Sequence, residues 1–102
     1  SAARPAAVGE ILALYASGLG PTRPSVDWGT AFPASPASVV NSPVEVLVNG
    51  ARAEVLGAVG YPGAVDGYQV NFRIPGDAAK GPASVVVVSA WTRSEAVTIA
   101  IQ

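Results

Sequence analysis

The sequence predicts an all-β protein, an immunoglobulin-like β-sandwich of about seven strands, with a small β-barrel as the alternative. Three observations support this prediction. Several short segments alternate apolar and polar side chains, which is typical of strands with one buried face. Alanine and the β-branched valine dominate the apolar residues, and small β-branched side chains favour sheets. Finally, 11 glycines and 9 prolines separate these segments, as turn residues do in β-proteins.

The N-terminal part predicts a linker followed by a strand. Residues 1–8 are rich in alanine with one proline, and we interpret them as an incoming linker. Residues 9–102 have the size of a single domain. By pattern alone, residues 9–16 fit either a helix or a strand. The glycines before and after this segment restrict it to a length that favours a strand.

Residues 21–42 predict a long loop. They combine serines and alanines with no sustained periodicity, and they contain Pro21, Pro24, Pro33 and Pro36. A loop of this length usually carries function or is held in place by its own hydrophobic side chains. We expect Trp28 and Phe32 to hold this loop on the core.

The second half of the chain predicts strands joined by short turns. Residues 44–48 alternate, with Val44, Val46 and Val48 on one face. Asn49-Gly50 follows, and both residues tolerate the positive φ of a two-residue hairpin turn, so residues 51–58 are the expected partner strand. Residues 68–74 show the clearest alternation. Their inward side chains are Tyr68, Val70, Phe72 and Ile74, and their outward ones are Gln69, Asn71 and Arg73.

Residues 83–90 and 96–102 predict the last two strands. The final strand is expected to bury Val97, Ile99 and Ile101. The strand before it contains four consecutive valines, residues 85–88, so one alternate pair must face away from the core. We expect that pair to be covered by the Pro-rich loop or by a preceding domain, because an exposed apolar strip tends to mark an interface. Burial of both pairs inside the sandwich would contradict this.

Composition and charge exclude several classes of function. Six Lys and Arg residues are spread singly along a chain with seven Asp and Glu and a net charge of -1. This predicts neither nucleic-acid binding nor attachment to an anionic membrane surface. No apolar run approaches the roughly 20 residues that cross a bilayer, so we expect no membrane insertion. The absence of histidine and cysteine removes the commonest general base, the usual zinc ligands and any disulfide.

The remaining polar residues form no recognisable catalytic or metal-binding motif. Most carboxylates fall at turns or on outward strand positions, which predicts a solvated surface rather than the paired acids of glycoside hydrolysis. No Asp-x-Asp run predicts a calcium loop. Gly18-Leu19-Gly20 lacks the spacing of a phosphate-binding loop. We therefore expect a protein that is not an enzyme, with no catalytic residue, cofactor or metal.

Two segments carry a resemblance to a known family. Residues 9–21 read Gly-Glu-Ile-Leu-Ala-Leu-Tyr-Ala-Ser-Gly-Leu-Gly-Pro, and residues 44–101 include Gly-Tyr-Gln-Val-Asn at 67–71. Together they resemble the Solibacter-type C-terminal domain of acidobacterial exported proteins, itself similar to IPT/TIG immunoglobulin-like domains. The resemblance implies a β-sandwich at the C-terminus of a larger exported protein, hence an extracytoplasmic location, either secreted or at the cell surface. It implies no activity and transfers no ligand-binding residue.

Two functional hypotheses follow. The first is a non-catalytic structural or interaction module, monomeric as an isolated domain, whose partners are other domains of the same polypeptide. The alternative is a carbohydrate- or polymer-binding module in which Trp91, Tyr61 and Trp28 stack on sugar rings. Two or more coplanar, exposed rings would favour the alternative.

Overall fold

The all-β prediction is confirmed by the computed structural model, which describes residues 5–90, 93 and 97–102. This part of the chain contains no helix, and therefore none that could cross a membrane. Every pairing between its strands is antiparallel. The strands are β1 (Ile11–Ser17), β2 (Thr22–Arg23), β3 (Val39–Val40), β4 (Val44–Val48), β5 (Ala51–Gly60), β6 (Gly67–Arg73), β7 (Gly81–Ser89) and β8 (Val97–Ile101).

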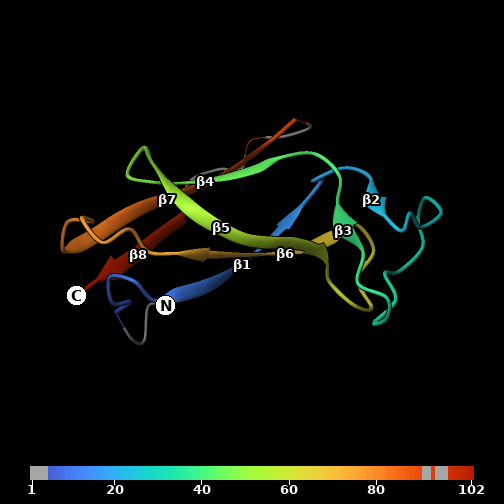
Figure 1. Ribbon diagram of the computed structural model, residues 1–102, viewed down its shortest axis with the longest axis horizontal. Coiled ribbons are helices and arrows are strands. Elements are labelled where there is room, and N and C mark those ends of the chain that lie inside the picture. Colours follow the sequence, from blue (N-terminus) through green and yellow to red (C-terminus); the bar gives the residue numbers. More distant parts are fainter. Residues whose placement is uncertain (1–4, 91–92, 94–96) are drawn as a thin grey trace.

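The strands form one curled sheet in the order β1-β6-β5-β4-β7-β8 (Figure 1). The long strand β5 joins its two halves. It pairs with β4 through residues 51–53 and with β6 through residues 54–60, and a register shift between Val55 and Gly57 interrupts the pairing with β6. The short strand β3 contacts β5 at Val39↔Val59, and β2 pairs with β3. The molecule is elongated, with principal extents of 42 × 24 × 19 Å.

Alternation places the predicted side chains in the core. In β6 the side chains of Tyr68, Val70 and Phe72 are buried, and Ile74 directly after the strand is fully buried. In β4 the buried positions are Val46 and Val48, with Val44 half-buried. The strand prediction for residues 9–16 is also confirmed by β1. The largest fully buried side chains are Phe72, Leu19, Ile74, Val46, Val70 and Val85.

Leu19 is a core residue that the sequence pattern did not single out. It lies between Gly18 and Gly20, whose φ angles of 71° and 94° turn the chain sharply on either side of it. The leucine is completely buried, and burying a side chain of this size contributes about 1.5–3 kcal/mol. The turn after β1 is therefore part of the core as well as a connection.

The hairpin between β4 and β5 has the predicted two-residue turn. Asn49 and Gly50 both adopt positive φ, 51° and 82°, as a type I′ turn requires. The Asn49 side chain adds a link to β7, because its Oδ1 accepts a hydrogen bond of 2.9 Å from the Ser84 backbone N–H. The backbone N–H of Asn49 in turn donates to the Ser84 carbonyl at 2.8 Å.

Strand β8 departs from its predicted burial at one end. Ile101 is buried and Ile99 half-buried, but Val97 is 50% exposed, so its predicted burial is wrong. Val97 shares a face with Val85, its cross-strand partner in β7. It is the first residue of β8, the last strand in the sheet order.

The end of the predicted linker packs on the sheet. Ala6 is fully buried and forms a parallel bridge with Ile101. Its N–H donates to the Ala100 carbonyl at 2.8 Å, and its carbonyl accepts from the Gln102 N–H at 2.9 Å. Packing therefore begins within the segment 1–8 that the composition suggested as a linker.

The valine run divides as strand alternation requires. Val85 and Val87 are buried, while Val86 and Val88 remain half-buried on the opposite face. Val86 lies opposite Leu47 of β4, which is half-buried as well. Only one of the two pairs is fully buried, so a partly exposed apolar strip remains on the opposite face. Its cover by the Pro-rich loop or by a preceding domain stays a prediction.

Candidate functional site

The Pro-rich segment closes over the end of the molecule opposite the β4–β5 hairpin (Figure 1). The pairing of β2 with β3 holds its base, so the predicted loop over residues 21–42 contains two short strands. Phe32 anchors its middle, as predicted. Its ring is buried and packs at 5.2 Å, centroid to centroid, against the ring of Tyr68. The Phe32 N–H also donates to the Ala64 carbonyl at 2.9 Å.

Close packing under Phe32 depends on a glycine. A Cβ atom on Gly60, the last residue of β5, would collide with the Phe32 ring. Gly60 also donates its N–H to the Ser38 carbonyl at 2.8 Å. The missing side chain thus lets the aromatic ring lie directly on the strand backbone.

Trp28 does not anchor the loop, so this expectation is wrong. Its exposed fraction is 103%, which means that the indole packs on nothing. The reason is local: the Asp27 carbonyl accepts a 3.0 Å hydrogen bond from the Thr30 N–H, and Gly29 has a φ of 80°. A four-residue turn with positive φ at its third residue is a type II turn. This turn projects the side chain of its second residue, Trp28, into solvent.

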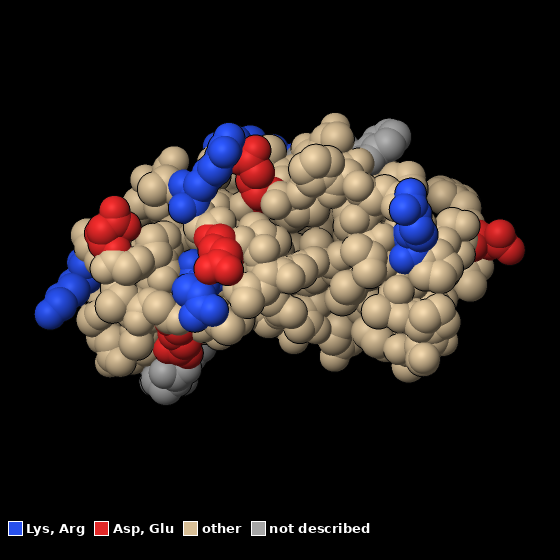
Figure 2. Space-filling view, in the orientation of Figure 1, with Lys and Arg blue, Asp and Glu red and all other residues tan. Residues whose placement is uncertain are grey.

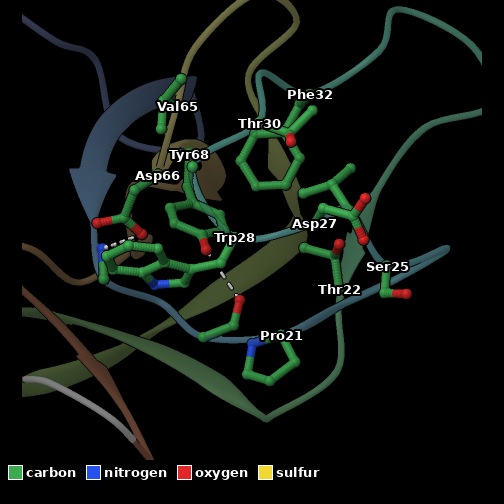
Figure 3. A pocket seen from close by; sticks show the side chains of 14 residues that line it. Pro21, Thr22, Ser25, Asp27, Trp28, Thr30, Phe32, Val65, Asp66 and Tyr68 are labelled. Atoms are coloured by element: carbon green, nitrogen blue, oxygen red, sulfur yellow. Dashed lines mark hydrogen bonds between the residues drawn. The ribbon is translucent and has the colours of Figure 1, made fainter.

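A groove of about 740 Å³ lies beside this turn (Figure 3). Its volume falls within the range of small-ligand sites. Segments around the end of β1, the Pro-rich loop and the β5–β6 connection contribute to it. The lining residues are Gly18, Gly20, Pro21, Thr22, Ser25, Val26, Asp27, Trp28, Gly29, Thr30, Phe32, Val65, Asp66 and Tyr68.

Two hydrogen bonds hold the wall of the groove near Tyr68, and both are drawn in Figure 3. The Tyr68 hydroxyl donates to the Gly20 carbonyl at 2.8 Å, and the Gly18 N–H donates to Asp66 Oδ1 at 3.2 Å. Asp66 itself has a φ of 55°, a conformation that Asp and Asn adopt more readily than other side chains. Burial raises the pKa of the Tyr68 hydroxyl, and the negative charge of Asp66 raises this pKa further.

The groove carries negative charge. Its described lining includes the exposed carboxylates of Asp27 and Asp66 but no Lys or Arg. In the view of Figure 3 the two carboxylates lie on opposite sides of the Tyr68 ring. Among the described residues neither carboxylate forms an ion pair; the pairs found there are Arg52–Glu45 and Arg73–Glu54. Arg23 lies next to Thr22, but the alternation of β2 buries Thr22 and turns Arg23 away to solvent.

The other aromatic candidates do not join Trp28 in a flat surface. Tyr61 is 43% exposed and contacts Tyr15 of β1, with ring centroids 5.4 Å apart and ring planes at 89°. Sequence reasoning missed Tyr15, because the pattern of residues 9–16 does not indicate which face of the predicted strand lies outward. Trp91 lies outside the described residues. The exposed pair is therefore perpendicular instead of coplanar.

The described residues show no metal centre. No three His, Cys, Asp or Glu side chains gather in this part of the chain. The acidic side chains within it are exposed or half-exposed, which leaves them solvated. The groove therefore offers an indole, hydroxyls, backbone groups and two separate carboxylates for non-covalent contacts.

Comparison of the chain with protein-family models, with curated proteins and with solved structures found no match.

Proposed function

We propose that this chain is a non-catalytic interaction module of a larger exported protein, located at its C-terminus and outside the cytoplasm. In this proposal the curled sheet is an immunoglobulin-like sandwich of the IPT/TIG kind. The two halves joined by β5 support it, because β4 and β7 supply Val46 and Val85 to the same core that receives Val70 and Phe72 from β6. The module binds its partner through the groove beside Trp28.

The observation that carries this proposal is the fully exposed indole of Trp28. Tryptophan buries a large apolar area when it is covered, and it is enriched among the residues that dominate binding energy at interfaces. A turn presents it at the rim of a groove, and the Phe32 anchor holds the loop beneath it. The loop that carries the exposed ring is therefore itself held in place by Phe32.

A carbohydrate-binding role is the second candidate, and the same residue favours it. An exposed indole can stack on the apolar face of a sugar ring, and Thr30 and Ser25 offer hydroxyls nearby in the groove. The perpendicular Tyr15–Tyr61 pair does not extend Trp28 into a flat platform. This candidate therefore rests on a single ring.

Binding experiments with the complete 102-residue chain test the proposal. A Trp91→Phe variant leaves Trp28 as its only tryptophan, so fluorescence reports on the groove. We expect at least one ligand class, either short charged peptides or soluble neutral polysaccharides, to shift this fluorescence without being chemically changed. The amide chemical shifts of the groove residues should change on addition of the same ligand.

The matched comparison is Trp28→Ala against Tyr15→Ala. Both remove an exposed aromatic ring, but only Trp28 lines the groove. We expect Trp28→Ala to abolish binding and Tyr15→Ala to leave it unchanged. Absence of binding by both ligand classes, or equal loss in both variants, would refute a groove-mediated interaction.

A further inference from the structure

We infer that the groove beside Trp28 binds an arginine side chain from an extended peptide segment of a partner protein. This inference rests on the proposed function and specifies the chemistry of its ligand. The guanidinium would lie against the Trp28 indole and pair with the Asp66 carboxylate, while Asp27, on the other side of the Tyr68 ring in Figure 3, attracts the cation at longer range.

Charge complementarity is the first argument. Both carboxylates of the described lining lack an ion-pair partner within the described chain, whereas Glu45 and Glu54 elsewhere have arginine partners at 3.0 and 3.2 Å. One oxygen of Asp66 already accepts the Gly18 N–H, which fixes the carboxylate at the groove wall. A neutral ligand would gain little from two unpaired negative charges, whereas a cation gains from both.

The exposed indole is the second argument, because it selects guanidinium over other cations. Guanidinium is planar and weakly hydrated, so it stacks on an aromatic face while its N–H groups donate to carboxylates at its edge. Tryptophan is the best aromatic partner for such a cation. Trp28 leaves its ring faces open to solvent, with Asp27 as its neighbour in the chain.

The size and position of the groove indicate a peptide segment as the source of the arginine. A volume of about 740 Å³ exceeds what one guanidinium occupies, and Pro21 and Val65 add apolar surface for flanking residues. The described chain ends pair with each other through Ala6 and Gln102 at the opposite end of the molecule (Figure 1). The groove therefore lies away from the described ends at Ala6 and Gln102.

A pair of peptides tests this directly. The first is a seven-residue, end-blocked peptide with one arginine flanked by prolines and alanines. The second replaces arginine by citrulline, which has nearly the same shape but no charge. We expect the arginine peptide to bind the Trp91→Phe chain at concentrations up to about 5 mM. The citrulline peptide should bind at least about tenfold more weakly, because charge-assisted hydrogen bonds are roughly twice as strong as neutral ones.

Variants of the groove locate the effect. Asp66→Asn keeps an oxygen for the Gly18 N–H and a residue type that tolerates positive φ, so the fold should persist while affinity falls about fivefold. Asp27→Asn should weaken binding by a similar or smaller factor. Trp28→Ala should weaken it at least about tenfold. Asp77→Asn, an exposed acid outside the groove, is the matched control and should change nothing.

Ionic strength gives an independent readout. The screening length falls from about 30 Å at 0.01 M salt to about 10 Å at 0.1 M, so arginine-peptide affinity should fall over this range. Affinity in the Asp27→Asn, Asp66→Asn double variant should depend less on salt.

The outcomes separate this inference from the proposed function. Equal affinity for the arginine and citrulline peptides, or unchanged affinity in both Asn variants, would overturn the arginine assignment. Binding of a neutral polysaccharide through Trp28, with no binding of the arginine peptide, would also overturn it but would leave a groove-mediated interaction standing. Binding of neither ligand would refute both the arginine assignment and the proposed function.

Discussion

The two ends of the molecule differ in the arrangement of their charged and apolar side chains. Over the end that carries the β4–β5 hairpin, acidic and basic side chains gather together, as the left half of Figure 2 shows. Arg52 pairs there with Glu45, and Arg73 pairs with Glu54 and also donates to the Gly9 carbonyl at 2.9 Å. At the groove end, Asp27 and Asp66 have no ion-pair partner within the described chain, and Trp28 is uncovered.

The difference between the two ends indicates which surface is available for binding. At the hairpin end two ion pairs form within the chain, and exposed pairs of this kind contribute only about 0–1 kcal/mol each. At the groove end Phe32, Leu19 and Tyr68 are buried beneath the surface, while the Trp28 side chain above them is fully exposed. Stability and the candidate binding surface therefore depend on different residues.

The largest expected effect tests whether both ends depend on one core. Phe72 is fully buried in β6, a strand that contributes to the shared hydrophobic core. Phe72→Ala should therefore lower the free energy of unfolding by about 3–5 kcal/mol. In the Trp91→Phe background, urea titration followed by far-ultraviolet circular dichroism and by Trp28 fluorescence should show one shared midpoint. A separate, unshifted transition in Trp28 fluorescence would mean that the groove end folds independently.

Two glycines in β5 allow the packing at the groove end to be tested separately. Gly60→Ala places a methyl group against the Phe32 ring and should lower the free energy of unfolding by about 1–3 kcal/mol. Gly57 in the same strand has open space around its Cβ position, so Gly57→Ala is the matched control and should be nearly neutral. Equal effects of the two substitutions in thermal denaturation would argue against close Phe32 packing.

Tyr68→Phe tests the hydrogen bond behind the groove wall. Removal of the hydroxyl leaves the Gly20 carbonyl without its donor and should cost about 1–3 kcal/mol. The pKa of Tyr68 is raised above 10.0 in the folded state. The folded state therefore retains this proton where the unfolded state has lost it, and stability should fall as pH rises above 10. Denaturant titrations across this range should show less of this decrease in Tyr68→Phe than in the wild type.

The smallest effect is expected at the hairpin end. Arg52→Ala removes the ion pair with Glu45, whose partners are 79% and 45% exposed, so we expect a change of about 0–1 kcal/mol. The change should shrink further in high salt because the pair is screened. A loss above this range, measured by urea denaturation, would show that the pair stabilises the hairpin more than exposed pairs normally do.

Much of the candidate site was visible in the sequence only as separate residues. Trp28 and Tyr61 were named as possible contacts, but Asp66 and Tyr68 could not be joined to Trp28, since they are far apart in the chain. Even the exposure of Trp28 had a local signal: Gly29 follows it, and glycine at the third position of a turn permits the type II geometry. Hydrophobicity alone suggested a buried anchor and was misleading.

Residue pattern alone was enough to predict the longer strands, because side-chain alternation in residues 68–74 and the Asn49-Gly50 turn are local features, whereas β2 and β3 were predicted as loop. It could not determine which outward residues stay exposed. Val97 is exposed at the start of the last strand in the sheet order, and Leu19 is buried because two left-handed glycines turn it inward. The tertiary structure alone brought Asp27, Asp66 and Trp28 to one groove, because their proximity depends on how β1, the Pro-rich loop and the β5–β6 connection pack together.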